Sequence, residues 1–98
     1  MKILALEKDV SGISETGFTD EILKDEAACV WQLHQTGMIR ELYFRADRNA
    51  AVLMLECASV DEARAVLSTL PLVKRKLIEF DIIPLVAYPG FARLFQSP

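Results

Sequence analysis

Residues 38–57 read MIRELYFRADRNAAVLMLEC, and this stretch decides the fold. It contains two runs rich in aliphatic, β-branched and aromatic residues, 38–45 and 50–57, separated by Asp47-Arg48-Asn49. Aspartate and asparagine tolerate the left-handed backbone conformation that tight turns require. The stretch therefore predicts a β-hairpin of two adjacent antiparallel strands.

A strand and a helix are predicted before this hairpin. The apolar run 2–6 predicts the first strand, and residues 8–18 predict a loop rich in small and polar residues. Thr19 is suited to cap a helix that runs to about Thr36, because threonine side chains accept hydrogen bonds from the first turn. Gly37 is the expected residue just after the end of that helix.

A second helix and a last strand are predicted after the hairpin. Ser59 and Glu62 have the spacing of a capping box, followed by one apolar helical stripe that Pro71 is expected to stop. The apolar run 77–86 predicts the fourth strand. The chain then turns into a short apolar tail, 88–98.

The predicted order of elements is strand-helix-strand-strand-helix-strand, the split β-α-β arrangement of ferredoxin-like folds. We expect an α+β domain in which two helices cover one face of a four-stranded antiparallel sheet. In the third strand, Leu53 and Leu55 point to one face, while Val52 and Met54 point to the other. A sheet face in water usually carries polar residues. We therefore expect a second copy of the chain, in a homodimer, to cover the far face, and the tail 88–98 to pack on that partner subunit.

Composition limits the classes of function. Ninety-eight residues, 52% of them hydrophobic, fit one domain, 1–98. A net charge of −3, with 74–76 as the longest basic run, predicts no nucleic-acid partner. The chain has no signal-peptide pattern and no run of about 18 apolar residues, so we expect a cytoplasmic protein without a membrane anchor. Cys29 and Cys57 lack metal or disulfide spacing, and we expect no metal and no cofactor.

Glu26 is the residue that does not fit the pattern of its helix. Each helical residue is rotated by 100° around the helix axis, so Glu26 lies about 40° from Ile22. It therefore belongs to the apolar stripe that also holds Leu33 and faces the sheet. A carboxylate in an apolar interior either finds hydrogen-bond donors or stays protonated, and a raised pKa suits a general acid–base. Two structural alternatives stay open: an ion pair with Arg40, and a position at the edge of the helix.

Three further residues are candidates for contacting a substrate. Arg40 is the cation suited to a developing oxyanion or a substrate carboxylate, if its face of the strand points inward. Tyr43 lies on the same strand, where packing is the alternative role. His34 is the only histidine and lies at the flank of the apolar stripe, where a partly exposed imidazole without function is the alternative.

Several short motifs resemble, in order and spacing, those of muconolactone isomerases over residues 19–82. The motifs are Asp25-Glu26, Leu33, Gly37-x-x-Arg40-x-Leu42, Ser59-Val60-x-Glu62, Leu70-Pro71-Leu72 and Ile78-Glu79-x-Asp81.

The resemblance implies two ferredoxin-like subunits packed sheet to sheet in a dimeric α/β barrel, with decamers in the isomerase itself. It also implies a cofactor-free proton shift in an unsaturated lactone during aromatic catabolism, in a pocket between helices and sheet. The chain departs from the family pattern at Ala27, where the isomerases carry a basic residue. Ile39 and Tyr43 stand where tryptophans are expected, and the polar C-terminal segment of the isomerases is replaced by an apolar one. Fold transfers across such changes more readily than substrate choice.

Three functions stay open. The first is an isomerase acting on a small unsaturated ring or lactone, in which Glu26 removes and returns a proton. We expect this substrate to be anionic, with Arg40 facing its carboxylate or the developing oxyanion. The second is a cofactor-free monooxygenase of the dimeric-barrel type. The third is a non-enzymatic small-molecule binder, which a Glu26–Arg40 pair without an adjacent cavity would favour.

Overall fold

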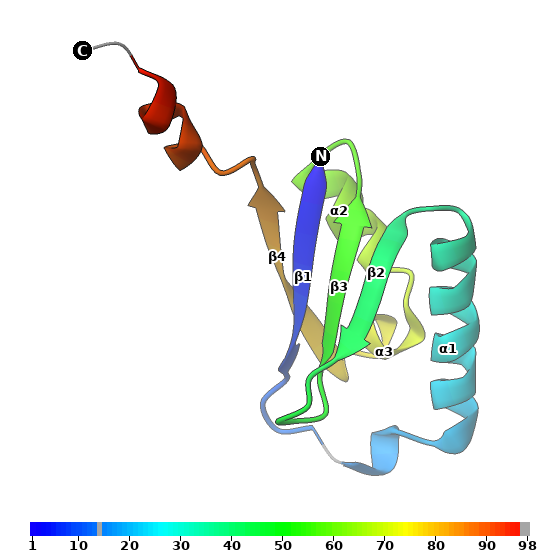
Figure 1. Ribbon diagram of the computed structural model, residues 1–98. Helices are drawn as coiled ribbons and strands as arrows, with labels where there is room; N and C mark the ends of the chain where they lie inside the picture. The colour runs from blue at the N-terminus through cyan, green and yellow to red at the C-terminus, as the bar shows by residue number, and fades with distance from the viewer. Residues whose placement is uncertain (14, 97–98) are drawn as a thin grey trace.

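The computed structural model describes residues 1–13 and 15–96, in which strands and helices both occur (Figure 1). Residue 14 of the predicted loop and residues 97 and 98 of the predicted tail lie outside the described residues. In chain order the elements are β1 (Lys2–Asp9), η1 (Glu15–Gly17), α1 (Asp20–Gln35), β2 (Ile39–Phe44), β3 (Ala51–Glu56), α2 (Val60–Leu67), α3 (Pro71–Lys74), β4 (Ile78–Leu85) and η2 (Gly90–Phe95).

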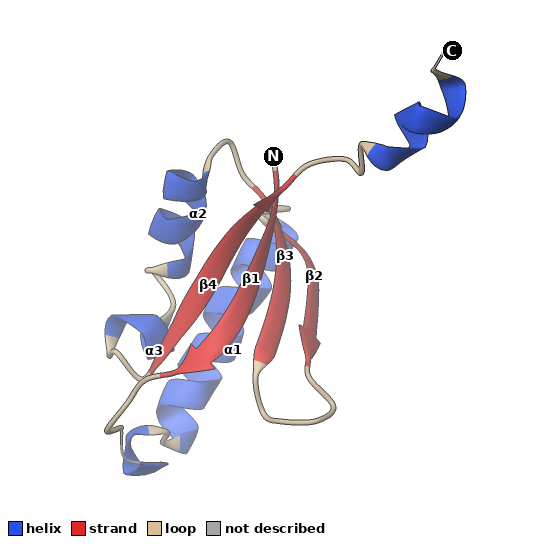
Figure 2. Ribbon diagram, turned by 90° about the vertical axis from the view of Figure 1, so that its left-hand side faces the viewer, coloured by secondary structure: helices blue, strands red, loops and turns tan. Residues whose placement is uncertain are grey.

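The four strands form one antiparallel sheet in the order β2-β3-β1-β4. The helices α1, α2 and α3 lie on one face of this sheet, and no helix of the described residues covers the other face (Figure 2). The predicted α+β, ferredoxin-like fold is therefore confirmed.

Side-chain caps fix where the helices begin and end. The Oγ1 atom of Thr19 accepts a hydrogen bond from the Ile22 N–H at 3.2 Å, and the Oγ atom of Ser59 accepts from the Glu62 N–H at 3.1 Å. Gly37 follows α1 with a φ of +85°, a left-handed conformation that favours glycine. These caps confirm the predicted helix starts and the predicted end of α1.

None of the described helices is long and apolar enough to cross a membrane.

Two predicted boundaries are wrong. The first strand continues beyond residue 6 to Asp9, because its polar end pairs with β4, with Glu7 opposite Phe80 and Lys8 opposite Glu79. The second helix ends before Pro71, and this proline instead begins α3. Proline fits the first position of a helix, where the missing N–H has no intrahelical partner to lose.

The core lies between the helices and the sheet. Ile3, Leu55 and Ile39, which are fully buried, come from three neighbouring strands and share the helix-facing side. Burying each such aliphatic side chain contributes about 1.5–3 kcal/mol to folding. The other members of the main core cluster are Ala5, Leu53, Cys57, Ala63, Leu67 and Leu70.

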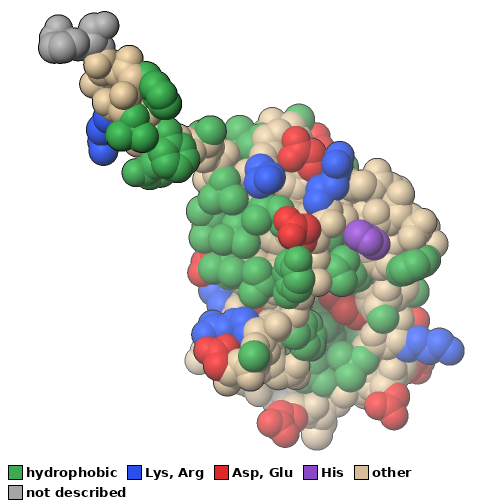
Figure 3. All heavy atoms as spheres, viewed as in Figure 1, with side chains coloured by type: hydrophobic (Ala, Val, Ile, Leu, Met, Phe, Trp, Pro, Cys, Tyr) green, Lys and Arg blue, Asp and Glu red, His purple; other side chains and the backbone are tan. Residues whose placement is uncertain are grey.

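The far face of the sheet is apolar, as predicted from the two-sided pattern of the third strand. Leu4 stands at its centre, opposite Met54 on one side and Ile83 on the other. Figure 3 shows this apolar area over the strands, with charged side chains at its margins. Within the described chain nothing covers it, and Ile83 remains 38% exposed. An apolar centre with a charged rim is the usual composition of a protein–protein interface.

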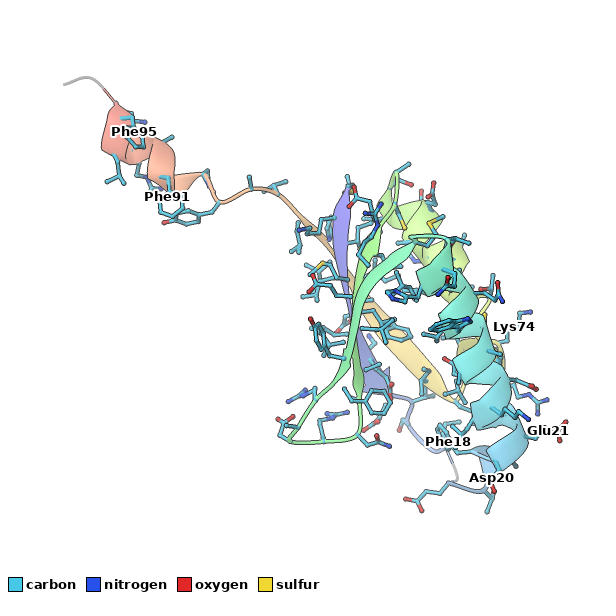
Figure 4. All side chains as sticks on the ribbon, turned by 45° about the vertical axis from the view of Figure 1, so that its right-hand side comes forward. Phe18, Asp20, Glu21, Lys74, Phe91 and Phe95 are labelled. Carbon is cyan, nitrogen blue, oxygen red and sulfur yellow. The ribbon has the colours of Figure 1, made fainter. Side chains whose placement is uncertain are left out.

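The C-terminal segment projects away from the domain (Figures 1 and 4). It extends the molecule to 62 Å along its longest axis, against 28 and 23 Å along the others. Phe91, Leu94 and Phe95 of η2 are 67%, 74% and 83% exposed. Such exposure of large apolar side chains in one short segment marks a surface that binds another surface.

Candidate active site

A cavity of about 440 Å³ lies between α1 and the helix-facing side of the sheet. Its walls are mostly apolar and include Leu23 and Val30 of α1, Leu42 and Phe44 of β2, and Phe80 of β4. Leu42 and Phe44 remain exposed, so the cavity is open along the edge formed by β2. A hollow beside the sheet is visible in the space-filling view (Figure 3). A mostly apolar cavity with a few polar groups is the usual form of a small-molecule site.

Glu26 contributes a carboxyl group to this cavity. Its Oε1 atom accepts a hydrogen bond from the backbone N–H of Leu72 at 2.9 Å, at the start of α3. In the part of the chain that the structure describes, Glu26 makes no ion pair and Oε2 has no hydrogen-bond donor. One carboxyl oxygen is therefore fixed by the fold, while the other is free to meet a ligand.

The surroundings of Glu26 favour its protonated form. Burial raises the pKa of the Glu26 carboxyl above its ordinary value of 4.5, and the negative charge of Glu7 adds to the increase. The hydrogen bond from Leu72 acts in the opposite direction. A carboxyl group with a raised pKa exchanges protons nearer to neutral pH, as a general acid–base requires.

Glu7 is a second carboxyl group in the same cavity, and sequence analysis did not single it out. Burial raises the pKa of Glu7 as well, against the effect of a hydrogen bond that its Oε1 atom accepts from the Ala51 N–H at 3.1 Å. The signal in the sequence is the alternation of Ile3, Ala5 and Glu7, which puts all three on the helix-facing side once the strand is extended. Glu7 also borders a larger hollow of about 620 Å³ with a more polar lining.

The structure does not bring Arg40 to Glu26. The pairing of β2 with β3 shifts register between Ile39 and Glu41, which leaves Arg40 at a bulge. The Arg40 Nε atom donates a hydrogen bond to the Gly37 carbonyl oxygen at 2.6 Å, so the guanidinium lies against the end of α1. Arg40 does not line the cavity of the described chain. The alternative of a structural ion pair between Arg40 and Glu26 is therefore wrong.

Neither His34 nor Tyr43 bonds to Glu26 in the described chain, and each has a hydrogen-bond partner elsewhere. The Nδ1 atom of His34 lies 2.9 Å from the Ile39 carbonyl oxygen, and this exposed residue does not line the cavity. Tyr43 does line it, but its hydroxyl donates to Glu41 Oε1 at 3.0 Å. Of the four residues predicted from the sequence, Glu26 and Tyr43 border the cavity, while the ring of Tyr43, whose strand partner is Val52, lies on the far-face side of the sheet.

Comparison with known proteins is consistent with this fold. The sequence model of the muconolactone delta-isomerase family matches residues 13–90. The crystal structure of muconolactone isomerase is similar with a TM-score of 0.71 at 19% identity, over 92% of this chain and 93% of the isomerase. A 5-chloro-2-hydroxyhydroquinone dehydrochlorinase from Burkholderia phenoliruptrix AC1100, in complex with 2,5-dihydroxybenzoquinone, is similar with a TM-score of 0.59 at 17% identity, over 92% and 98% of the two chains. No curated protein matches the chain in sequence.

The family match spans both the helix that carries Glu26 and the hairpin that forms the cavity wall. It extends beyond the motifs on which the resemblance was first based. By fold and by sequence, the chain belongs to the muconolactone delta-isomerase family.

Proposed function

We propose that the protein is a cofactor-free isomerase that moves a proton within a small unsaturated ring or lactone, with Glu26 as the acid–base. The observation that carries this proposal is the Glu26 carboxyl group, held by one backbone N–H inside an apolar cavity and bound to no cation of the described chain. A Glu26–Arg40 pair without an adjacent cavity would have favoured the non-enzymatic binder, and the described chain has neither feature.

The proposed step needs one carboxylate and no other reactant. In a β,γ-unsaturated lactone, the carbon between the carbonyl group and the double bond carries an acidic proton. The Glu26 carboxylate removes this proton and leaves a dienolate, whose negative charge lies on the carbonyl oxygen. The carboxylic acid then returns the proton to the far end of the dienolate, so that the double bond moves and Glu26 is restored.

Two solved structures support a small ring compound as the substrate class. One is a muconolactone isomerase, and the other is a dehydrochlorinase with a dihydroxybenzoquinone. Both names denote oxygenated rings of a size that a cavity of about 440 Å³ accommodates. Aromatic catabolism is the metabolic setting that we infer for this chain.

We also propose that the working form is a homodimer, with the far faces of two sheets packed together. The row formed by Leu4, Met54 and Ile83 supports this arrangement, because it is apolar and nothing in the described chain covers it. The tail beyond residue 88 would then pack on the partner subunit and bury its exposed phenylalanines.

Two free thiols, Cys29 and Cys57, suit a reducing, cytoplasmic compartment.

Deuterium exchange tests the proposed chemistry directly. The substrate is 5-methyl-2(3H)-furanone, a β,γ-unsaturated lactone, and proton NMR in D₂O follows both exchange and conversion to the conjugated isomer. We expect Glu26→Gln to lower the protein-dependent rate by about 10²–10⁴-fold, the usual contribution of a general acid–base. Glu21→Gln is the matched control, since Glu21 lies exposed on the same helix (Figure 4).

Glutamine keeps an oxygen that accepts the Leu72 N–H, so the variant is expected to fold and assemble like the wild type. A Glu26→Gln protein with the full wild-type rate would show that the proton shift does not use this residue. Oxygen uptake with a quinol, in place of lactone conversion, would assign the monooxygenase function instead.

A further inference from the structure

The Glu26 carboxyl group is held by a backbone turn that lies 46 residues further along the chain. Its Oε1 atom accepts the Leu72 N–H at 2.9 Å, in a partly buried contact. Leu72 is the second residue of α3, and the sequence motif Leu70-Pro71-Leu72 forms the turn. The motif therefore ends on the hydrogen bond that the described chain gives to Glu26.

The sequence of the turn makes its backbone rigid. A proline restricts the residue before it to extended backbone, and Leu70 accordingly has φ −68° and ψ 131°. Pro71 itself has φ restricted to about −65°, a helical value suited to the first residue of α3. Leu70 is fully buried, and its carbonyl oxygen accepts the Lys74 N–H at 2.9 Å. The direction of the Leu72 N–H is thereby fixed before a ligand binds.

Leu72 contacts α1 through both its side chain and its backbone. The side chain is 8% exposed and belongs to one apolar cluster with Ile22, which lies one turn before Glu26. Helical residues four apart share a face, so the face of α1 that the leucine side chain covers is also the face that carries Glu26. A hydrogen bond anchored by this packing holds the carboxyl group in one orientation and leaves Oε2 for a ligand.

We propose that Leu72 is a positioning residue of the isomerase, whose backbone N–H holds the Glu26 carboxylate in the orientation in which Oε2 removes the substrate proton. This inference rests on the proposed function and deepens it. A donor to a carboxylate also stabilises its charged form, and the Leu72 hydrogen bond lowers the pKa of Glu26 against the effect of burial. The same bond thus orients the base and keeps it ionised at lower pH.

Few other ionisable groups face Glu26. In the described lining of the cavity they are Glu7 of β1, whose negative charge raises the pKa of Glu26, and Tyr43 of β2, whose hydroxyl donates to Glu41 at 3.0 Å. The remaining described residues that line the cavity are all apolar. Glu7 is therefore the group from which the effect of Leu72 has to be separated.

NMR titration tests the hydrogen bond in solution without requiring turnover. An amide proton that donates to a carboxyl group shifts downfield when the carboxylate forms, so the Leu72 amide proton should titrate with the same pKa as the Glu26 carboxyl carbon. Glu26→Gln should abolish this titration, whereas the matched control Glu7→Gln should retain it. A Leu72 amide proton that does not titrate, or that titrates only while Glu7 is present, overturns the inference.

An amide-to-ester substitution in the full chain tests the positioning role. Replacing Leu72 by its α-hydroxy acid removes the N–H and keeps the side chain, so the pKa of Glu26 should rise and the fall in furanone turnover at low pH should move to higher pH with it. Above that pH, kcat should be about tenfold or more below wild type, because the carboxylate has lost its orientation. KM should change by less than about threefold, since the apolar lining is intact. Leu72→Ala keeps the N–H and loses the packing, so it should lower stability while the fall at low pH stays at its wild-type position.

A carboxylate that became more basic but kept its orientation would give a kcat at or above the wild-type value at high pH, and that result overturns the positioning role. An ester protein whose fall at low pH stays at the wild-type position overturns it as well. Failure of the proposed function looks different, because the wild-type protein would not convert 5-methyl-2(3H)-furanone, or Glu26→Gln would convert it fully. The titration of the Leu72 amide proton would then still decide whether the turn holds the Glu26 carboxylate.

Discussion

Replacing Ile83 by lysine should separate the proposed dimer without unfolding the subunit. Ile83 lies opposite Leu4 on the apolar far face and is 38% exposed in the single chain. Because part of this side chain is already covered in the single chain, the free energy of unfolding of one subunit should fall by about 1–2 kcal/mol at most, which leaves the subunit folded. In the dimer, by contrast, two lysines would enter the apolar centre of the interface beside Leu4 and Met54.

The cost to the dimer follows from that geometry. Each copy loses about 1 kcal/mol of apolar burial, since burying a whole isoleucine contributes about 1.5–3 kcal/mol and only its exposed part remains to be buried. Removing an ammonium group from water costs several kcal/mol more for each copy. A total above about 5 kcal/mol raises Kd more than a thousandfold.

Sedimentation velocity and light scattering at micromolar concentration measure this change in mass. The wild type should sediment as a dimer or a larger assembly, and Ile83→Lys as a monomer with an unchanged circular dichroism spectrum. Ala65→Lys is the matched control, because it adds the same charge to an exposed position of α2. A wild-type monomer, or an Ile83→Lys protein of wild-type mass, would refute the proposed packing of the two sheets.

Three further outcomes are expected. Leu55→Ala, at a fully buried position, should lower the free energy of unfolding in urea by about 2–5 kcal/mol, whereas Phe95→Ala should lower it by less than about 0.5 kcal/mol. Because folding raises the pKa values of Glu7 and Glu26 above their ordinary 4.5, the folded state binds these protons more tightly than the unfolded state. The free energy of unfolding should therefore fall as pH rises from about 4.5 through the raised pKa values, and the Glu7→Gln/Glu26→Gln double variant should flatten this slope in urea titrations at several pH values. Phe91→Ala/Phe95→Ala should reduce the assembled mass in light scattering while leaving subunit helicity unchanged, because this tail is exposed in the single chain (Figure 4).

The fold could be predicted from the sequence because its signals are local and agree with one another. Thr19 and Ser59 begin the two main helices as expected, and the hairpin follows from the turn residues between its two apolar runs. The error at Pro71 arose because a proline is compatible both with the end of one helix and with the start of another. Only the hydrogen bonds after residue 67 distinguish these two cases.

The site was less predictable, because it depends on pairing between distant elements. The helical period was sufficient to direct Glu26 at the sheet, but the polar end of β1 was taken for a loop, so Glu7 was not considered. Its strand conformation depends on partners in β4, more than seventy residues away. The bulge that turns Arg40 aside is likewise a property of the β2–β3 register and has no signature in the side chains of β2.

The two carboxyl groups also argue for chemistry over structure. The one protein hydrogen bond of each group comes from a backbone N–H, which the oxygen of a glutamine would accept equally well. Burial of both groups penalises their charged forms, and no ion pair of the described chain compensates for that cost. Glutamine at both positions would accept the same backbone hydrogen bonds. It would also give a larger free energy of unfolding at pH values above the raised pKa values, so the fold by itself does not need glutamate here. What glutamates add at these two positions is the ability to gain and lose a proton inside an apolar cavity, which is the property that a cofactor-free isomerase requires.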